Sequence, residues 1–128
     1  MHLFNKLSGI VTNTLPLNAG IEVLECLQEN GKSPYKKWFN ALPATIAAKV
    51  SVALLRIEMG NLSSVKWFEG IGEFVLNTGP GYRIYLCKDG PNLIILLGGG
   101  TKHRQQKDID QAKELFAHYK ARKKNKRI

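Results

Sequence analysis

Cations that can bind a phosphate group follow two glycine-rich stretches of the chain. Arg83 follows Gly79-Pro80-Gly81 after one intervening residue, Tyr82, and a triple glycine is followed by Thr101 and then by Lys102, His103 and Arg104. An arginine holds phosphate through two parallel hydrogen bonds, a lysine supplies a compact positive charge, and a histidine exchanges protons near neutral pH. These residue types predict a site for a polyanion, with catalysis as one possible use.

The segment around Arg83 reads as a strand whose face suits RNA. Side chains alternate across a strand, so Arg83, Tyr85 and Cys87 share one face. An arginine can hold a phosphate while a neighbouring tyrosine stacks on a base. The alternative interpretation is that Glu73, on a neighbouring strand, fixes Arg83 and that Tyr85 is merely half-buried.

The triple glycine at 98–100 permits two interpretations as well. Glycines leave no side chain in the way of a ligand, but they also make simple turns. Their spacing matches neither a P-loop nor a dinucleotide fingerprint. His103 is a candidate general acid or base, or else a surface histidine without a catalytic role. RNA cleavage through the neighbouring 2′-hydroxyl requires no metal, only orientation, proton transfer and cations near the phosphorane.

The charge of the chain points to a negative partner. The 128 residues carry 19 Lys and Arg against 10 Asp and Glu, a net charge of +9, and residues 99–128 account for +7 of it. Nucleic acid is favoured over an anionic membrane or an acidic protein, although a basic surface also serves solubility. With 44% hydrophobic and 23% charged residues, the chain has the composition of a single globular domain.

The cysteines and histidines predict neither a metal site nor a disulfide. Cys26 and Cys87 lie in apolar strand-like runs, so we expect buried, reduced thiols in a cytoplasmic protein, with a disulfide as the less favoured alternative. Two cysteines and three scattered histidines lack metal-ligand spacing, so no cofactor is expected. Residues 1–20 resemble neither a signal peptide nor a membrane span, and we interpret them as an N-terminal extension.

The first half of the domain predicts a strand and two helices. Residues 21–27 form the expected strand. Ser33-Pro34 then predicts a helix start, because serine caps well and proline is tolerated in the first turn. Ile46, Val50, Leu54 and Ile57 make one apolar face of a second helix, and Met59-Gly60-Asn61 resembles a glycine C-cap.

The second half predicts a sheet and a final helix. Strands are expected at 65–68, 73–76, 82–87 and 93–97, and the first two are one bulged strand or two separate ones. Short connectors favour antiparallel pairing. Asp108 is the expected cap of a last helix that packs through Ile109 and Tyr119. Residues 120–128 are so densely basic that a frayed, solvated tail is expected.

These motifs, taken in order, resemble the RelE/HigB-type toxins of type II toxin–antitoxin systems, within the RelE/ParE superfamily. The branch of phage-related addiction module killer proteins is the most similar. The resemblance covers residues 21–119 and is carried by the following segments: Glu58-Met59-Gly60-Asn61, Val65-Lys66, Gly70-Ile71-Gly72-Glu73-Phe74, Gly79-Pro80-Gly81-Tyr82-Arg83-Ile84-Tyr85, Leu96-Leu97-Gly98-Gly99-Gly100-Thr101-Lys102 and Gln106-Lys107-Asp108-Ile109.

The resemblance implies an α+β fold of order β-α-α-β-β-β-α, with a curved, mostly antiparallel sheet backed by helices. It also implies a metal-independent endoribonuclease that cuts mRNA on the ribosome, inhibits translation, and is silenced by a cognate antitoxin. Carried over by position, Arg83 matches the phosphate-binding arginine, and Lys102 and its neighbours match the cations after the last strand. The candidate catalytic residues are Arg83, Lys102 and His103. The candidate RNA-binding residues are Lys66, Tyr85, Arg104, Lys107, Lys120, Arg122, Lys123 and Lys124.

One position departs from the family pattern. Val75 stands where such toxins usually carry a basic residue, and a missing cation at the transition state could cost on the order of 3 kcal/mol. Two alternatives therefore stay open. The same fold serves ParE-type poisons of DNA gyrase, and it could also serve a basic nucleic-acid-binding protein without catalysis.

Overall fold

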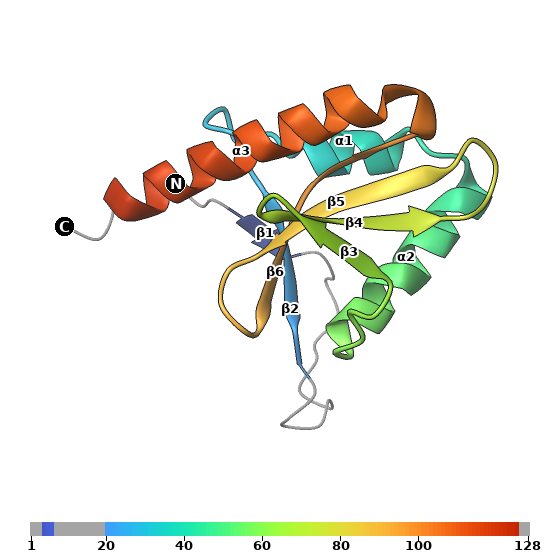
Figure 1. The fold of residues 1–128 in the computed structure, drawn as a ribbon, viewed down its shortest axis with the longest axis horizontal. Helices are drawn as coiled ribbons and strands as arrows, with labels where there is room; N and C mark the ends of the chain where they lie inside the picture. The colour runs from blue at the N-terminus through green and yellow to red at the C-terminus, as the bar shows by residue number, and fades with distance from the viewer. Residues whose placement is uncertain (1–3, 7–19, 126–128) are drawn as a thin grey trace.

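The computed structural model describes residues 4–6 and 20–125 and has an α+β fold, as the sequence predicts (Figure 1). From β2 onward, strands and helices follow one another along the chain with short connections. The strands are β1 (Phe4–Lys6), β2 (Glu22–Cys26), β3 (Val65–Phe68), β4 (Ile71–Leu76), β5 (Tyr82–Lys88) and β6 (Leu93–Gly100). The helices are α1 (Pro34–Asn40), α2 (Ala44–Glu58), the 3-10 turn η1 (Lys102–Arg104) and α3 (Gln105–Asn125).

The six strands form one mixed sheet in the order β1-β2-β6-β5-β4-β3. β2 and β6 pair in parallel, with Glu25 opposite Leu96, and the other described pairs are antiparallel. The pairing of β2 with β6 ends at Leu96, whereas β6 continues to Gly100. The last four residues of β6 therefore have a strand neighbour, β5, on one side alone among the described residues.

Local signals place both early helices as expected. Ser33 Oγ accepts a hydrogen bond from the Lys36 backbone N–H at 3.0 Å, which caps α1 directly before Pro34. At the end of α2, Gly60 has a φ of 96°, and the N–H groups of Gly60 and Asn61 bond back to the carbonyls of Ile57 and Arg56. These two hydrogen bonds form a Schellman motif, which requires the left-handed backbone that glycine adopts freely.

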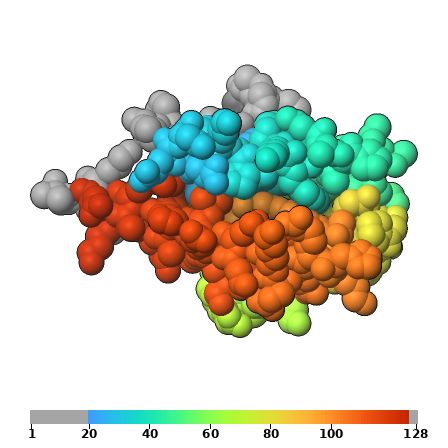
Figure 2. Space-filling model, turned by 90° about the horizontal axis from the view of Figure 1, so that it is seen from above, coloured from blue at the N-terminus to red at the C-terminus, as the bar shows by residue number. Residues whose placement is uncertain are grey.

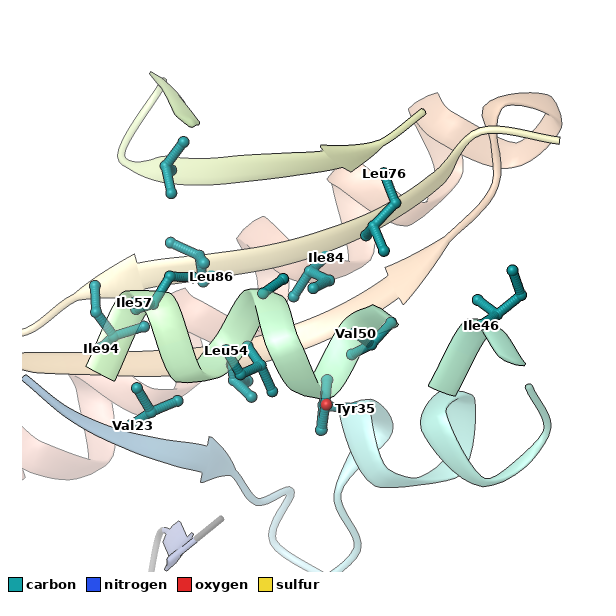
Figure 3. Close-up of a cluster of buried hydrophobic side chains, with 13 residues drawn as sticks. Val23, Tyr35, Ile46, Val50, Leu54, Ile57, Leu76, Ile84, Leu86 and Ile94 are labelled. Carbon is teal, nitrogen blue, oxygen red and sulfur yellow. The ribbon is translucent and has the colours of Figure 1, made fainter. Parts of the chain in front are cut away.

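Two apolar clusters hold the helices against opposite faces of the sheet. α1 and α2 cover one face, where α2 packs Val50, Leu54 and Ile57 onto Ile84 and Ile94 (Figure 3). α3 covers the other face and packs Ile109, Leu115 and Tyr119 against Cys26, Cys87 and Ile95. Each fully buried aliphatic side chain stabilises the fold by about 1.5–3 kcal/mol. The sheet is therefore buried on both faces. This packing fixes the strands in place and with them the turns at the strand ends.

Three sequence-based expectations need correction. The expected order β-α-α-β-β-β-α counted residues 65–76 as one bulged strand, whereas they form two strands, the other possibility that the sequence left open, because Glu69 (φ 51°) and Gly70 (φ 88°) make a two-residue turn with both residues left-handed. α3 begins at Gln105, so Asp108 lies in its first turn and is not its cap.

The third correction concerns the two ends of the domain. The chain stays helical to Asn125 instead of fraying after Tyr119. Within the predicted N-terminal extension, Phe4–Lys6 pairs with β2 as an edge strand. The remainder of that extension up to residue 19, and the last three residues of the predicted tail, lie outside the described residues.

Candidate nucleic-acid interface

Arg83 and Lys102 meet at one turn of the structure, although 18 positions separate them in the sequence. Gly81 (φ 75°) lies between them: a Cβ there would lie 3.0 Å from Arg83 Nη1 and 3.7 Å from Lys102 Cβ. The Lys102 N–H also donates to the Pro80 carbonyl oxygen at 3.3 Å. The antiparallel pairing of Arg83 with Gly100 causes this meeting, because it brings the start of β5 beside the end of β6.

We call the surface formed by Arg83, Lys102, His103, Arg104 and Lys107 the basic end. It combines a mostly buried arginine with solvent-exposed basic side chains. Lys102, His103, Arg104 and Lys107 are all exposed. η1 turns the chain sharply from β6 into α3, so its three consecutive side chains fan out from one short turn. The structure thus brings together the three residues that the sequence marks as catalytic and two of the predicted RNA-binding cations.

Arg83 itself is mostly buried and has a carboxylate partner. Its Nε lies 3.4 Å from Glu73 Oε2, and its Nη1 donates to the Gly81 carbonyl oxygen at 2.6 Å. Its side chain is 11% exposed. Gln105, the first residue of α3, donates to the same Glu73 oxygen at 2.9 Å. The alternative interpretation, in which Glu73 fixes Arg83, is therefore confirmed, and the pair also ties the start of α3 to the sheet.

Tyr85 does not present its ring to a ligand. It is fully buried beneath α3, and its place in the α3-facing cluster explains why. Burial is the main reason that its pKa is raised, with the neighbouring Glu73 carboxylate as a second cause. The prediction that Tyr85 stacks on an RNA base is wrong, because the amphipathic α3 covers that face of β5.

Two of the three consecutive glycines are needed for packing. A Cβ at Gly99 would lie 2.3 to 2.5 Å from three atoms of the Trp38 indole, and a Cβ at Gly100 would lie 1.9 Å from Asp108 Oδ2. Gly98 has nothing within 4 Å of its Cβ position. The segment is part of β6 and not a free turn, so its glycines admit α1 on one side and α3 on the other.

The remaining predicted contacts do not belong to the basic end as defined above. Lys66 is exposed on β3, and Lys120 lies over the Phe116 ring at 4.4 Å. Arg122 donates to the Leu27 carbonyl oxygen at 2.7 Å, and Lys123 pairs with Asp89. Lys124 is exposed near the end of α3, about 30 Å along the helix from its start. The C-terminal cations therefore form a second basic region and cannot hold the same phosphate.

Near the basic end, sequence reasoning missed Lys49 and did not foresee the contact of Asp108, which it named as a helix cap. Lys49 on α2 reaches the β4–β5 turn, where its Nζ lies 3.4 Å from Thr78 Oγ1. Asp108 is directed onto Gly100, and burial raises the pKa of its carboxyl while Arg104 and Lys107 oppose that rise. Neither placement has a local sequence signal, since each depends on which helix face meets the sheet.

The thiols behave as predicted. Cys26 and Cys87 are free and buried in the α3-facing cluster. Burial raises the pKa of Cys26 to about 11 and that of Cys87 further, so both remain protonated at neutral pH.

Among the described residues, none of the helices combines the length and the apolar character that a membrane span requires.

Comparison with known proteins finds one informative similarity. An uncharacterized protein of Haemophilus influenzae is 40% identical to this chain over 83 residues, which make up 63% of this chain and 84% of that protein. No family model matches the chain, and no solved structure matches it significantly.

Proposed function

This chain belongs to the same family as the Haemophilus influenzae protein, whose name states no activity, and we propose its function from the geometry of the basic end. The chain is the toxin of a type II toxin–antitoxin module. It cuts mRNA on the ribosome without a metal ion and so inhibits translation. Its partners are then the ribosome, mRNA and a cognate antitoxin, and its topology is that of the RelE-like fold.

The observation that carries the proposal is the meeting of Arg83 and Lys102 at Gly81, with His103 exposed beside them. In the proposed reaction the ribose 2′-oxygen attacks the adjacent phosphorus and the bond from phosphorus to the 5′-oxygen breaks. The 2′-hydroxyl proton goes to a base, and the leaving 5′-oxygen takes up a proton. His103 is the proposed proton carrier, and Lys102 and Arg83 stabilise the charge of the phosphorane.

A second candidate is a nucleic-acid-binding protein without catalysis. Two observations favour it. Glu73 neutralises Arg83, and Val75 pairs with Arg83 across β4 and β5, where the resembling toxins usually carry a cation. Both features reduce the positive charge available at the phosphate. RNA would still bind through the exposed cations of η1.

Induced expression followed by mapping of mRNA 5′ ends distinguishes the two candidates. The wild type should stop growth and produce new 5′ ends, and co-expression of the adjacent reading frame should suppress both effects. Lys102→Ala should remove the cuts, whereas Lys88→Ala, an exposed cation at the other end of β5, should keep them.

Salt-sensitive RNA binding without cuts or growth arrest would select the non-catalytic candidate. Inhibition of DNA supercoiling with mRNA left intact would instead select the gyrase poison and refute the ribonuclease.

A further inference from the structure

A groove of about 1170 Å³ runs between α1 and α3 (Figure 2). We call it the α1–α3 groove. Its floor is the β6 segment from Leu97 to Gly99, where β2 no longer pairs with β6. Gly98 leaves this floor open, since nothing lies within 4 Å of its Cβ position. The groove is separate from the exposed η1 cations that define the basic end.

Three buried polar atoms without a hydrogen-bond partner belong to residues that line this groove. They are Glu25 Oε1, Asp108 Oδ2 and Arg122 Nε, and they make up three of the five such side-chain atoms among the described residues. Native proteins rarely leave buried polar atoms unpaired, because each one costs about 1–3 kcal/mol. Asp108 Oδ2 packs against Gly100, so Glu25 Oε1 and Arg122 Nε are the two atoms that a polar ligand in the groove would satisfy.

Glu25 defines what that ligand must offer. The residue is 1% exposed, and its Oε2 lies 3.7 Å from Lys36 Nζ, whereas its Oε1 has no partner. Lys36 already supplies the compensating positive charge, so a second full cation would be repelled. A neutral group that donates hydrogen bonds satisfies the carboxylate without that repulsion. Lys36 is about half exposed, so it can turn aside to admit such a group.

Among the four RNA bases, guanine alone presents two adjacent donors on its Watson–Crick edge, the N1–H and the N2 amino group. Adenine and cytosine place an acceptor nitrogen there, and uracil places two carbonyl oxygens around one N–H, so a carboxylate repels part of each edge. Carboxylate oxygens accept both guanine donors side by side. The chemistry of Glu25 therefore selects guanine.

The walls of the groove suit the rest of a nucleotide. Lys32, Lys36 and Lys37 lie on the wall formed by α1 and its preceding loop, where they can bind a phosphate. Trp38 is half-buried over Gly99 and offers an aromatic surface beside the floor. The buried Glu25 carboxylate beside exposed lysines matches a nucleotide whose base donates hydrogen bonds and which carries a phosphate.

We propose that the α1–α3 groove binds a guanosine phosphate unit, with the guanine edge on Glu25 and the phosphate at the α1 lysines. The unit is a free nucleotide or one guanosine of a single-stranded RNA. The guanine site stands on the groove alone, and only the RNA source rests on the proposed function.

Calorimetric titration of the full chain with GMP, IMP and AMP tests the proposal. GMP should bind about 10- to 100-fold more tightly than AMP, the discrimination of a bidentate base contact. IMP lacks the N2 amino group and should lie between them. Glu25→Gln should abolish the preference, while the matched variant Glu114→Gln, an exposed carboxylate of the same groove, should keep it. The three-nucleotide comparison on the wild type remains decisive if Glu25→Gln does not fold.

Equal affinities for GMP and AMP, no binding of GMP at millimolar concentration, or an unchanged preference in folded Glu25→Gln would each overturn the proposal. Two short RNAs that differ by one G-to-A change identify the source. Preference for the guanosine RNA assigns the site to RNA, and a preference confined to GMP assigns it to the free nucleotide; both results support the guanine site. A wild-type protein that cuts mRNA but binds GMP no more tightly than AMP would refute this inference and leave the proposed function standing.

Discussion

The ion pair between Glu73 and Arg83 gives the sharpest prediction about the fold. Their side chains are 6% and 11% exposed, so neither charge is well solvated. Arg83→Met leaves the Glu73 carboxylate buried with Gln105 as its donor and should lower the free energy of unfolding by about 3–5 kcal/mol. Glu73→Gln keeps an acceptor for Gln105 and leaves Arg83 bonded to Gly81, so it should cost less, about 1.5–3 kcal/mol.

The double variant separates the pair from its parts. Glu73→Gln with Arg83→Met leaves no buried charge, so it should be more stable than Arg83→Met alone, with a coupling energy of about 1–3 kcal/mol. Urea unfolding followed by tryptophan fluorescence measures all four proteins. The exposed pair of Glu69 and Lys113 serves as the control, because an ion pair in water should show no measurable coupling.

Two results would refute this reasoning. Arg83→Met could cost no more than Lys113→Met, or the double variant could lose the full sum of the single losses. If the comparison of the single and double variants confirms the predicted coupling, it has a practical consequence for tests of function. Arg83→Ala would then inactivate the protein partly by unfolding it, so loss of toxicity in that variant alone would not establish catalysis.

Two further predictions concern packing and pH. Gly99→Ala places a methyl group within 2.5 Å of the Trp38 ring and should cost about 1–3 kcal/mol, whereas Gly98→Ala meets nothing within 4 Å and should be near neutral; equal melting temperatures would contradict this packing. For Cys26, burial raises the pKa from 9.0 to about 11, so the unfolded thiol ionises first as pH rises. The stability due to the neutral thiol is present below pH 9 and lost between pH 9 and 11. Urea unfolding should therefore show the advantage of the wild type over Cys26→Ala shrinking across that range, and a constant difference would disprove it.

Local sequence signals predicted the early elements well. Ser33-Pro34 and Met59-Gly60 set helix ends through backbone chemistry that involves only neighbouring residues. The apolar period of α2 likewise depends on one face alone. The turn at Glu69-Gly70 was ambiguous, because a non-glycine residue with positive φ gives no clear signal.

The site was harder to predict because it depends on which faces meet. Alternation correctly placed Arg83 and Tyr85 on one face, but it could not say that α3 would cover this face and bury Tyr85. Arg83 and Lys102 meet through the register of β5 and β6, which spacing does not encode. The partners of Glu25 likewise depend on how α1 and α3 flank the end of β6.

The salt dependence of RNA binding tests the central claim most directly, namely that the basic end is the nucleic-acid interface. Each phosphate contact to single-stranded RNA contributes about 0.7 to the slope of log affinity against log salt concentration. Lys102→Ala with Arg104→Ala should lower the slope by about 1.4 for a short single-stranded RNA. Lys88→Ala with Lys124→Ala removes the same charge toward the far ends of β5 and α3 and should lower it clearly less. Equal reductions in the two double variants would contradict a localised interface.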